Sequence, residues 1–204
     1  LRLETPDWPG HFGGLAVLEA GPLLDAAGEL RLVEIRERLA RRLARVPRLR
    51  QRVLTLPFLG GKALWVDDDR FAVEQHVHQA VVPPPGDEAQ LLETAAEIYG
   101  RLLDRGRPLW ELWFLTGLDG GRLGALLKLH HAMADGTAAV AIIGSLFDLA
   151  PEVPDPAPEP WVPGPLPGAG SLAADNLAGK ARAVGRGGKA LAHPGRLIGR
   201  LQTI

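Results

Sequence analysis

Cysteine is absent from this sequence of 204 residues, and methionine and tyrosine occur once each. The lack of cysteine excludes disulfide bonds, thiolate metal ligands and a cysteine nucleophile within the chain, and it fits a reducing compartment. Neither sign of charge is in excess, because 23 basic residues face 24 acidic ones and the formal net charge is -1. We therefore expect no nucleic-acid partner, and any electrostatic recognition must come from local clusters.

Long apolar runs are also lacking. The stretch 137–143 is among the longest, and it is far short of the roughly 20 residues that cross a bilayer. No basic-then-apolar signal segment opens the chain. What is present, 46% hydrophobic and 23% charged residues, is typical of an ordinary globular domain. Because the chain begins at Leu1 rather than Met and stops at Ile204 without a terminating signal, we expect a fragment.

The first hundred residues alternate strand and helix patterns. The apolar stretch 10–18 predicts a buried strand, and apolar residues spaced three and four apart predict an amphipathic helix over 30–46. Two short runs, 62–66 and 71–82, favour strands. Asp87 can cap a second helix that continues until Gly106.

The next segment predicts a hairpin followed by a helix. Two β-favouring runs, 109–118 and 122–130, are joined by the turn residues 119–121, and 137–149 is apolar and long enough for a buried helix. Proline dominates 151–170, so we expect a semi-rigid linker there. This predicts a compact unit over 1–150, the linker over 151–170, and a weakly amphipathic segment over 171–204.

Chemistry concentrates in LKLHHAMADG, residues 127–136. Because side chains alternate along a strand, His131 should share a face with Leu127 and Leu129, while His130 points the other way. Burial among apolar neighbours would keep the His131 imidazole neutral and able to accept a proton, as a general base must. Two histidines on opposite faces cannot converge with Asp135 on one ion, so we expect no metal site.

Structural roles for these residues stay open. A histidine on an apolar face is often a hydrogen-bonded core residue, and Asp135 can serve as a helix cap or as the partner of a buried arginine, holding the loop. Gly136 indicates a tight bend or a close backbone approach, although ordinary use in a turn fits equally well.

The segment HHAMADG matches the His-His-x-x-x-Asp-Gly motif of acyl-CoA-dependent acyltransferases with the chloramphenicol acetyltransferase-like fold. LLDRGRPLWELWFLTGL (102–118) resembles the Pro-Leu-Trp segment of bacterial wax ester synthase/diacylglycerol acyltransferases, and VPRLRQRV (46–53) and FAVEQHVHQAVVPPPG (71–86) also fit. The resemblance is collinear over about residues 1–161 and implies an α/β fold, an α+β sandwich that forms one half of a pseudo-two-domain architecture. The family's second half is missing from this chain.

The resemblance implies transfer of a long-chain acyl group from acyl-CoA to diacylglycerol or a fatty alcohol, with no further cofactor. His131 would be the base, supported by His130, with Asp135 and Gly136 in the loop and Pro108, Leu109 and Trp110 near the acyl chain. The expected partners are these lipids, a carboxyl-terminal half and a peripheral membrane or lipid-body surface, in the cytoplasm. A different acceptor, or a half that is inactive without the other, are the alternatives.

Three other groups permit more than one interpretation. Trp110, Leu112 and Phe114 share one strand face and suit core packing or an acyl-chain lining. His76 and His78 have no third ligand nearby and receive no role. A set of arginines could meet phosphates or an anionic lipid surface, although a solvated helix face is the simpler interpretation. The set consists of Arg41, Arg42, Arg45, Arg48, Arg50 and Arg52.

Overall fold

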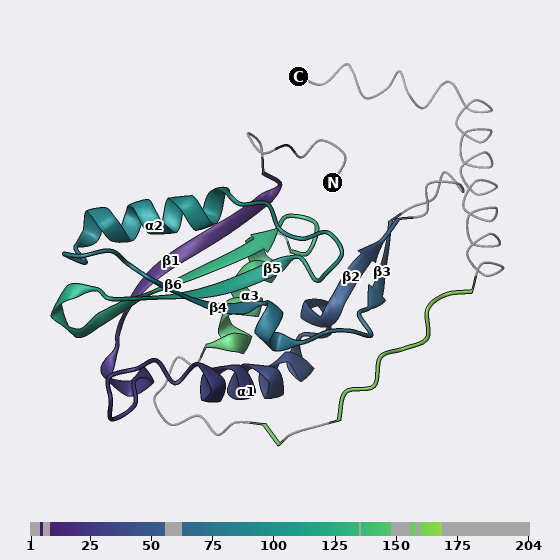
Figure 1. Cartoon of the computed structure of the whole chain (residues 1–204). Coiled ribbons are helices and arrows are strands. Elements are labelled where there is room, and N and C mark those ends of the chain that lie inside the picture. The colour runs from purple at the N-terminus through teal and green to yellow at the C-terminus, as the bar shows by residue number, and fades with distance from the viewer. Residues whose placement is uncertain are drawn as a thin grey trace, which may run out of the picture. The chain divides into compact units, whose positions relative to one another are not determined.

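A four-stranded sheet forms the centre of the larger described unit (Figure 1). The computed structural model describes residues 5, 9–55, 63–134, 136–147, 156–157 and 160–168. The strands are β1 (His11–Glu19), β4 (Val77–Val81), β5 (Trp110–Thr116) and β6 (Arg122–His130), in the order β1-β6-β5-β4. β6 pairs antiparallel with both β1 and β5, whereas β4 runs parallel to β5. The predicted hairpin is thereby confirmed, with β6 inside the sheet.

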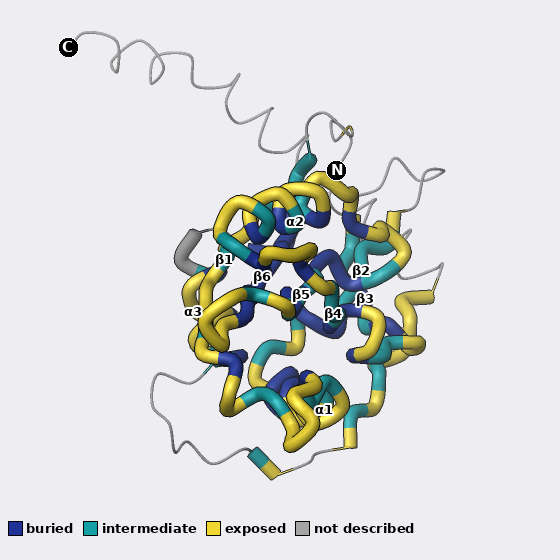
Figure 2. Tube along the Cα trace, turned by 60° about the vertical axis from the view of Figure 1, so that its left-hand side comes forward, coloured by how far each residue is buried: buried dark blue, intermediate teal, exposed yellow. Residues whose placement is uncertain are grey.

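Helices cover both faces of this sheet (Figure 1). α2 (Glu88–Gly100) packs Leu91, Ala95 and Ile98 on one face, against Leu115 and Leu126. α1 (Leu32–Arg42) and α3 (Gly136–Leu146) lie on the other face, in the larger core. Figure 2 shows the buried residues gathered on β5 and β6. This is the predicted α+β sandwich.

The details follow local chemistry. Asp87 caps α2 as predicted, because its carboxylate accepts from the backbone N–H groups of Ala89 (2.8 Å) and Gln90 (3.2 Å). α2 ends at Gly100 and not at Gly106. A second, two-stranded sheet pairs β2 (Gln51–Leu54), which was not predicted, with β3 (Leu64–Asp67).

Three further predictions about the fold need correction. Residues 73–75, expected in a strand, form a short 3-10 turn ahead of β4. The first strand exists but is not buried, because it lies at a sheet edge and Val17 is 49% exposed. The apolar segment after the histidines forms α3, which is buried on one side only, since Val140 is 70% exposed.

Part of the proline-rich segment contacts the sheet-bearing unit. Residues 160–168 have no regular secondary structure. The Trp161 ring lies edge-on to Phe71 at 6.0 Å and under the Arg50 guanidinium at 5.4 Å. The Gly164 N–H donates to the Asp67 carboxylate at 2.9 Å. The amphipathic prediction for 171–204 lies outside the described residues.

Candidate active site

The two histidines lie where β6 ends, and both neighbouring segments hold their backbone. His130 is the last residue of β6, and its N–H donates to the Leu109 carbonyl at 3.0 Å. The His131 N–H donates in the opposite direction, to the Gly10 carbonyl at 2.9 Å. The motif is therefore fixed between the beginning of β5 and the beginning of β1.

The predicted alternation of faces along β6 is confirmed. Leu127 and Leu129 pack in the larger core with α1 and α3. Lys128 faces α2, because its ammonium group donates to the Ile98 carbonyl at 3.0 Å. His130 lies opposite His11 of β1 in register, on the same face as Lys128.

His130 is a buried residue that shapes the turn. It is 3% exposed, and its Nδ1 accepts the N–H of Ala132 at 2.9 Å. Its carbonyl accepts the N–H of Met133 at 2.8 Å. Because Nδ1 is an acceptor here, the neutral ring carries its proton on Nε2. These contacts favour a supporting role for His130.

His131 is exposed, so the predicted burial of its imidazole was wrong. β6 ends one residue earlier, and His131 lies in the turn after it rather than in line with the core residues. Its ring packs against Phe12, with 4.7 Å between ring centroids and 39° between the planes. An exposed imidazole with a restrained ring can still accept a proton from a bound hydroxyl.

The rest of the motif is only partly described. Asp135 lies outside the described residues, so its role in holding the loop stays a prediction. Gly136 is the first residue of α3. The motif thus begins at the last residue of a central strand and ends at the first residue of a helix.

Pro108, Leu109 and Trp110 lie beside the motif, and all three are buried. The Trp110 indole donates to the Leu49 carbonyl at 2.7 Å and stacks on the His76 ring, 4.8 Å between centroids. These contacts make Trp110 a core residue. The role of Pro108, Leu109 and Trp110 near the acyl chain stays a prediction.

Two of the hollows in the described part of the chain differ in character and lie near the larger core and the Pro108 segment. One, about 380 Å³, is mainly apolar and lies among α1, α3, β1 and β5. Its apolar side chains are Leu18, Leu23, Ile35, Leu39, Phe114, Leu146 and Phe147. The aromatic face of β5 therefore contributes both to the core and, through Phe114, to a hollow suited to hydrocarbon.

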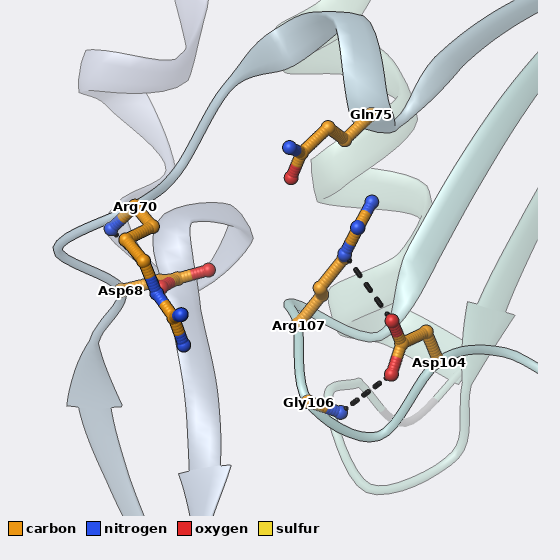
Figure 3. Close-up of a pocket in the computed structure, with 6 residues that line it drawn as sticks. All are labelled: Asp68, Arg70, Gln75, Asp104, Gly106 and Arg107. Carbon is orange, nitrogen blue, oxygen red and sulfur yellow. Dashed lines mark hydrogen bonds and ion pairs between the residues drawn. The ribbon is translucent and has the colours of Figure 1, made fainter.

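The other hollow, about 300 Å³, is polar. Figure 3 shows the residues that line it, Asp68, Arg70, Gln75, Asp104, Gly106 and Arg107. Asp104 accepts from the N–H of Gly106 at 2.8 Å and pairs with Arg107 Nε at 3.2 Å. Arg70 and Asp68 lie across the hollow from Arg107, with Gln75 above (Figure 3). This mixture of charges suits a hydrogen-bonding ligand group rather than an acyl chain.

An ion pair between a buried lysine and a partly buried glutamate, on the strand that leads to the motif, was missed from the sequence. Lys128 is fully buried and donates to the carbonyls of Ile98 and Arg101 (2.7 Å), and its ammonium lies 3.3 Å from the Glu111 carboxylate. Burial lowers the pKa of Lys128, while Glu111 opposes that shift. The signal was available, because Glu111 and Lys128 are cross-strand partners in the predicted hairpin.

The arginine set is not one surface. Arg42 is buried and donates to the Leu146 carbonyl at 2.9 Å, and Arg50 is buried and donates to the Ala40 carbonyl at 2.8 Å. Arg48 lies over the Trp65 ring at 4.4 Å, and Arg52 lies 3.7 Å from Asp68. Of the set, Arg45 is exposed. These arginines mostly hold the fold together.

His76 and His78 are packing residues, in line with the absence of a predicted role. The His76 ring is stacked between Phe71 and Trp110, and its Nδ1 lies 2.9 Å from the Trp110 carbonyl. The His78 ring packs on Trp113 at 4.5 Å. The pKa values of both imidazoles are lowered, mainly because burial disfavours the charged form.

Among the described helices, none combines the length and the apolar character that a bilayer span requires.

Relatives of this chain are acyltransferases. A probable diacylglycerol O-acyltransferase of Mycobacterium tuberculosis is 44% identical over 137 residues, 67% of this chain and 28% of that protein. A second from the same organism is 33% identical over 167 residues, 82% of this chain and 60% of that protein. The chain thus spans only 28% of the length of the first of these relatives.

Solved structures agree. The wax ester synthase/diacylglycerol acyltransferase from Marinobacter aquaeolei superposes with a TM-score of 0.62 at 25% identity, over 76% of this chain and 36% of that one. The SgcC5 protein from Streptomyces globisporus shares the fold, with a TM-score of 0.51 at 22% identity over 74% of this chain and 34% of that one. A family model described as the wax ester synthase/diacylglycerol acyltransferase catalytic domain matches residues 1–204. The chain therefore belongs to the wax ester synthase/diacylglycerol acyltransferase family.

Proposed function

We propose that this chain supplies the catalytic half of an O-acyltransferase, which moves a long-chain acyl group from acyl-CoA to diacylglycerol or a fatty alcohol. The observation that carries the proposal is the exposed imidazole of His131 in a member of this family: its ring packs on Phe12, and its backbone N–H is held by the Gly10 carbonyl. A general base must be accessible to the substrate hydroxyl and must keep its ring in one orientation.

The transfer is direct. His131 takes the proton of the acceptor hydroxyl as the hydroxyl oxygen bonds to the thioester carbonyl carbon. The carbon–sulfur bond then breaks, and the departing thiolate of coenzyme A takes from the imidazolium the proton that the acceptor hydroxyl gave up. General-base assistance of this kind supplies roughly 10²–10⁴-fold in rate, so positioning and stabilisation of the oxyanion supply the rest.

A covalent acyl-enzyme is disfavoured by the residues available. The chain has no cysteine. Ser145, on α3, donates its hydroxyl to the Ala141 carbonyl at 2.8 Å within its own helix. The other serine, Ser171, lies outside the described residues. His131 thus needs no nucleophilic partner from the described part of the chain.

The lipid substrates are supported by the apolar hollow beside α1 and α3. Its volume of about 380 Å³ lies in the ordinary range for ligand pockets. The names of the mycobacterial relatives agree with diacylglycerol as acceptor, and that of the Marinobacter enzyme agrees with either acceptor. Attachment to a membrane or lipid-body surface belongs to the same proposal.

The second candidate is that this chain catalyses the transfer only when it is combined with a carboxyl-terminal half. It is favoured by the short span of this chain, 28% of the length of a close relative, and by the exposure of His131, which a second half would cover.

The test is thiol release from palmitoyl-CoA, with and without diacylglycerol or a long-chain alcohol. Native chain, His131→Ala and His78→Ala are compared, since His78 packs on Trp113 away from the motif. Acceptor-dependent release that His131→Ala abolishes and His78→Ala retains supports catalysis by this half. No release from any of the three supports the second candidate, and equal release from all three removes His131 as the base.

A further inference from the structure

β1 is an edge strand, and no strand of the described part of the chain covers its outer side. It pairs with β6 on its inner side. The strand is nine residues long, His11–Glu19, and its register with β6 is unbroken from end to end. It contains no proline, lysine or arginine. Proteins normally protect an edge of this length with such residues or with a bulge.

Hydrogen-bond geometry identifies the backbone groups on the open side. The His131 N–H donates to the Gly10 carbonyl at one end of the ladder, and the Ala20 N–H donates to the Gly121 carbonyl at the other, both at 2.9 Å. In an antiparallel pair, alternate residues direct both backbone groups to the partner. The even-numbered residues therefore face β6, and the N–H and C=O groups of Gly13, Leu15 and Val17 face away.

The opposite edge of the same sheet is protected. β4 has five residues, and Arg36 donates both Nε (3.0 Å) and Nη2 (2.7 Å) to the Val77 carbonyl. Three prolines, residues 83–85, follow directly after Val82. Prolines and edge-capping side chains prevent the addition of a further strand. The contrast singles out β1 as the edge left open for pairing.

Apolar surface adjoins the open edge. A hollow of about 330 Å³ lies between β1, the first turns of α2 and the β5–β6 hairpin. Its apolar side chains are Leu15, Val17, Leu91, Leu92 and Leu118. Val17 is 49% exposed and Leu92 is 53% exposed. An added strand would cover part of this surface, as extended ligands do beside exposed sheet edges.

We propose that β1 pairs antiparallel with β1 of a second copy of this chain, about a twofold axis at Leu15. Leu15 is the middle residue of the strand, so this register centres the pairing on Gly13, Leu15 and Val17. At one end of the strand the His11 carbonyl already accepts the Tyr99 hydroxyl at 3.2 Å. Leu15 then faces Leu15 of the other copy, and Val17 of each copy faces Gly13 of the other. The backbone groups of these residues are the ones that point away from β6.

The strand is complementary to itself in this register. His11 and Glu19, its only ionisable residues, fall opposite one another, so no like charges meet. On the other face, Phe12 meets Leu18 and Gly14 meets Ala16, so that large residues pair with large and small with small. Such an isologous interface joins two four-stranded sheets into one continuous sheet.

Two edge valines provide a matched test, Val17 on β1 and Val81 on β4, which are 49% and 69% exposed. Sedimentation velocity over a concentration series would compare the full 204-residue chain with Val17→Lys and Val81→Lys. We expect a reversible dimer that Val81→Lys leaves unchanged and that Val17→Lys weakens by about tenfold or more, because a lysine on the paired edge must be desolvated. Circular dichroism checks that both variants fold.

Cysteine cross-linking tests the register, since the chain has no cysteine of its own. Opposed Leu15→Cys residues would be about 5.5 Å apart between Cα atoms, within disulfide reach. We expect oxidation to cross-link Leu15→Cys and not Val17→Cys, whose counterpart lies opposite Gly13. A chain that stays monomeric at every concentration, equal effects of the two lysine variants, or cross-linking through Val17→Cys instead of Leu15→Cys would each overturn the proposal.

Discussion

The phenyl ring of Phe12 lies 4.7 Å from the imidazole ring of His131, with 39° between the two planes. Phe12 belongs to β1, whereas His131 follows β6, and the Gly10 carbonyl of the same segment accepts the His131 N–H. The side chain and the backbone of His131 are therefore held by the neighbouring strand. This arrangement explains how an exposed histidine keeps one orientation.

Replacing Phe12 tests that relationship. We expect Phe12→Ala to lower kcat by about tenfold to a hundredfold with little change in KM for acyl-CoA, because a loosened base is misplaced without losing substrate contacts. Steady-state kinetics on the active form of the enzyme measure both constants. Phe12→Tyr keeps the ring and should stay near the native values. Unchanged kcat in Phe12→Ala would contradict the positioning role.

His131→Ala should abolish activity while leaving the fold intact. We expect turnover to fall by roughly 10²–10⁴-fold, the usual contribution of a general base. The melting temperature should hardly change, since His131 is exposed and the hydrogen bond from its backbone N–H to the Gly10 carbonyl does not need the side chain. Thermal unfolding and thiol release on the same sample separate these effects. A large loss of stability would count against the assignment.

His130→Ala, unlike His131→Ala, should lower the stability of the fold. His130 is 3% exposed and its Nδ1 accepts the Ala132 N–H, so the substitution leaves a space and an N–H without its acceptor. We expect the free energy of unfolding to fall by about 1–3 kcal/mol. Urea denaturation of His130→Ala beside His131→Ala measures the difference. Equal stability of the two variants would refute the supporting role of His130.

Removing the buried ammonium of Lys128 should be strongly destabilising. Lys128→Ala leaves Glu111 and the carbonyls of Ile98 and Arg101 without their cation, which typically costs about 3–5 kcal/mol. Adding Glu111→Gln should recover part of the loss, because the charge of the partly buried carboxylate is then gone. A double-mutant cycle by urea denaturation measures the coupling. Purely additive effects would mean that the two residues act independently.

Acid should destabilise this fold in part through His76. Burial lowers the pKa of His76 in the folded chain, so the unfolded chain binds more protons as the pH falls through the ordinary value near 6.5. The free energy of unfolding therefore decreases as the pH drops from about 7 into this range. His76→Phe keeps a ring between Phe71 and Trp110 but binds no proton.

The measurement is the stability of native chain and His76→Phe by urea denaturation at several pH values. We expect a shallower pH dependence in the variant, with the remaining slope including His78, whose pKa burial also lowers. A slope identical to that of the native chain would show that His76 does not contribute.

Local patterns were enough to predict much of the framework. The β5–β6 hairpin, α1 and the capped start of α2 follow from periodicity and turn chemistry among residues close in sequence. The opposite directions of Leu129 and His130 follow from strand alternation alone. The family could be inferred from the HHAMADG motif and the Pro-Leu-Trp segment, because their order along the chain is unusual. Those features need no knowledge of distant contacts.

Other features were decided by long-range contacts. A continuous apolar run such as 10–18 looks the same in a central strand and at an edge, so only the strand order reveals that β1 is open on one side. The exposure of His131 depends on where β6 ends, and the burial of Arg42 and Arg50 depends on distant carbonyls. Sequence alone determined the chemistry and local structure of the motif. Tertiary packing decided which segments hold His131 and which surfaces remain available, because both depend on contacts between residues far apart in the chain.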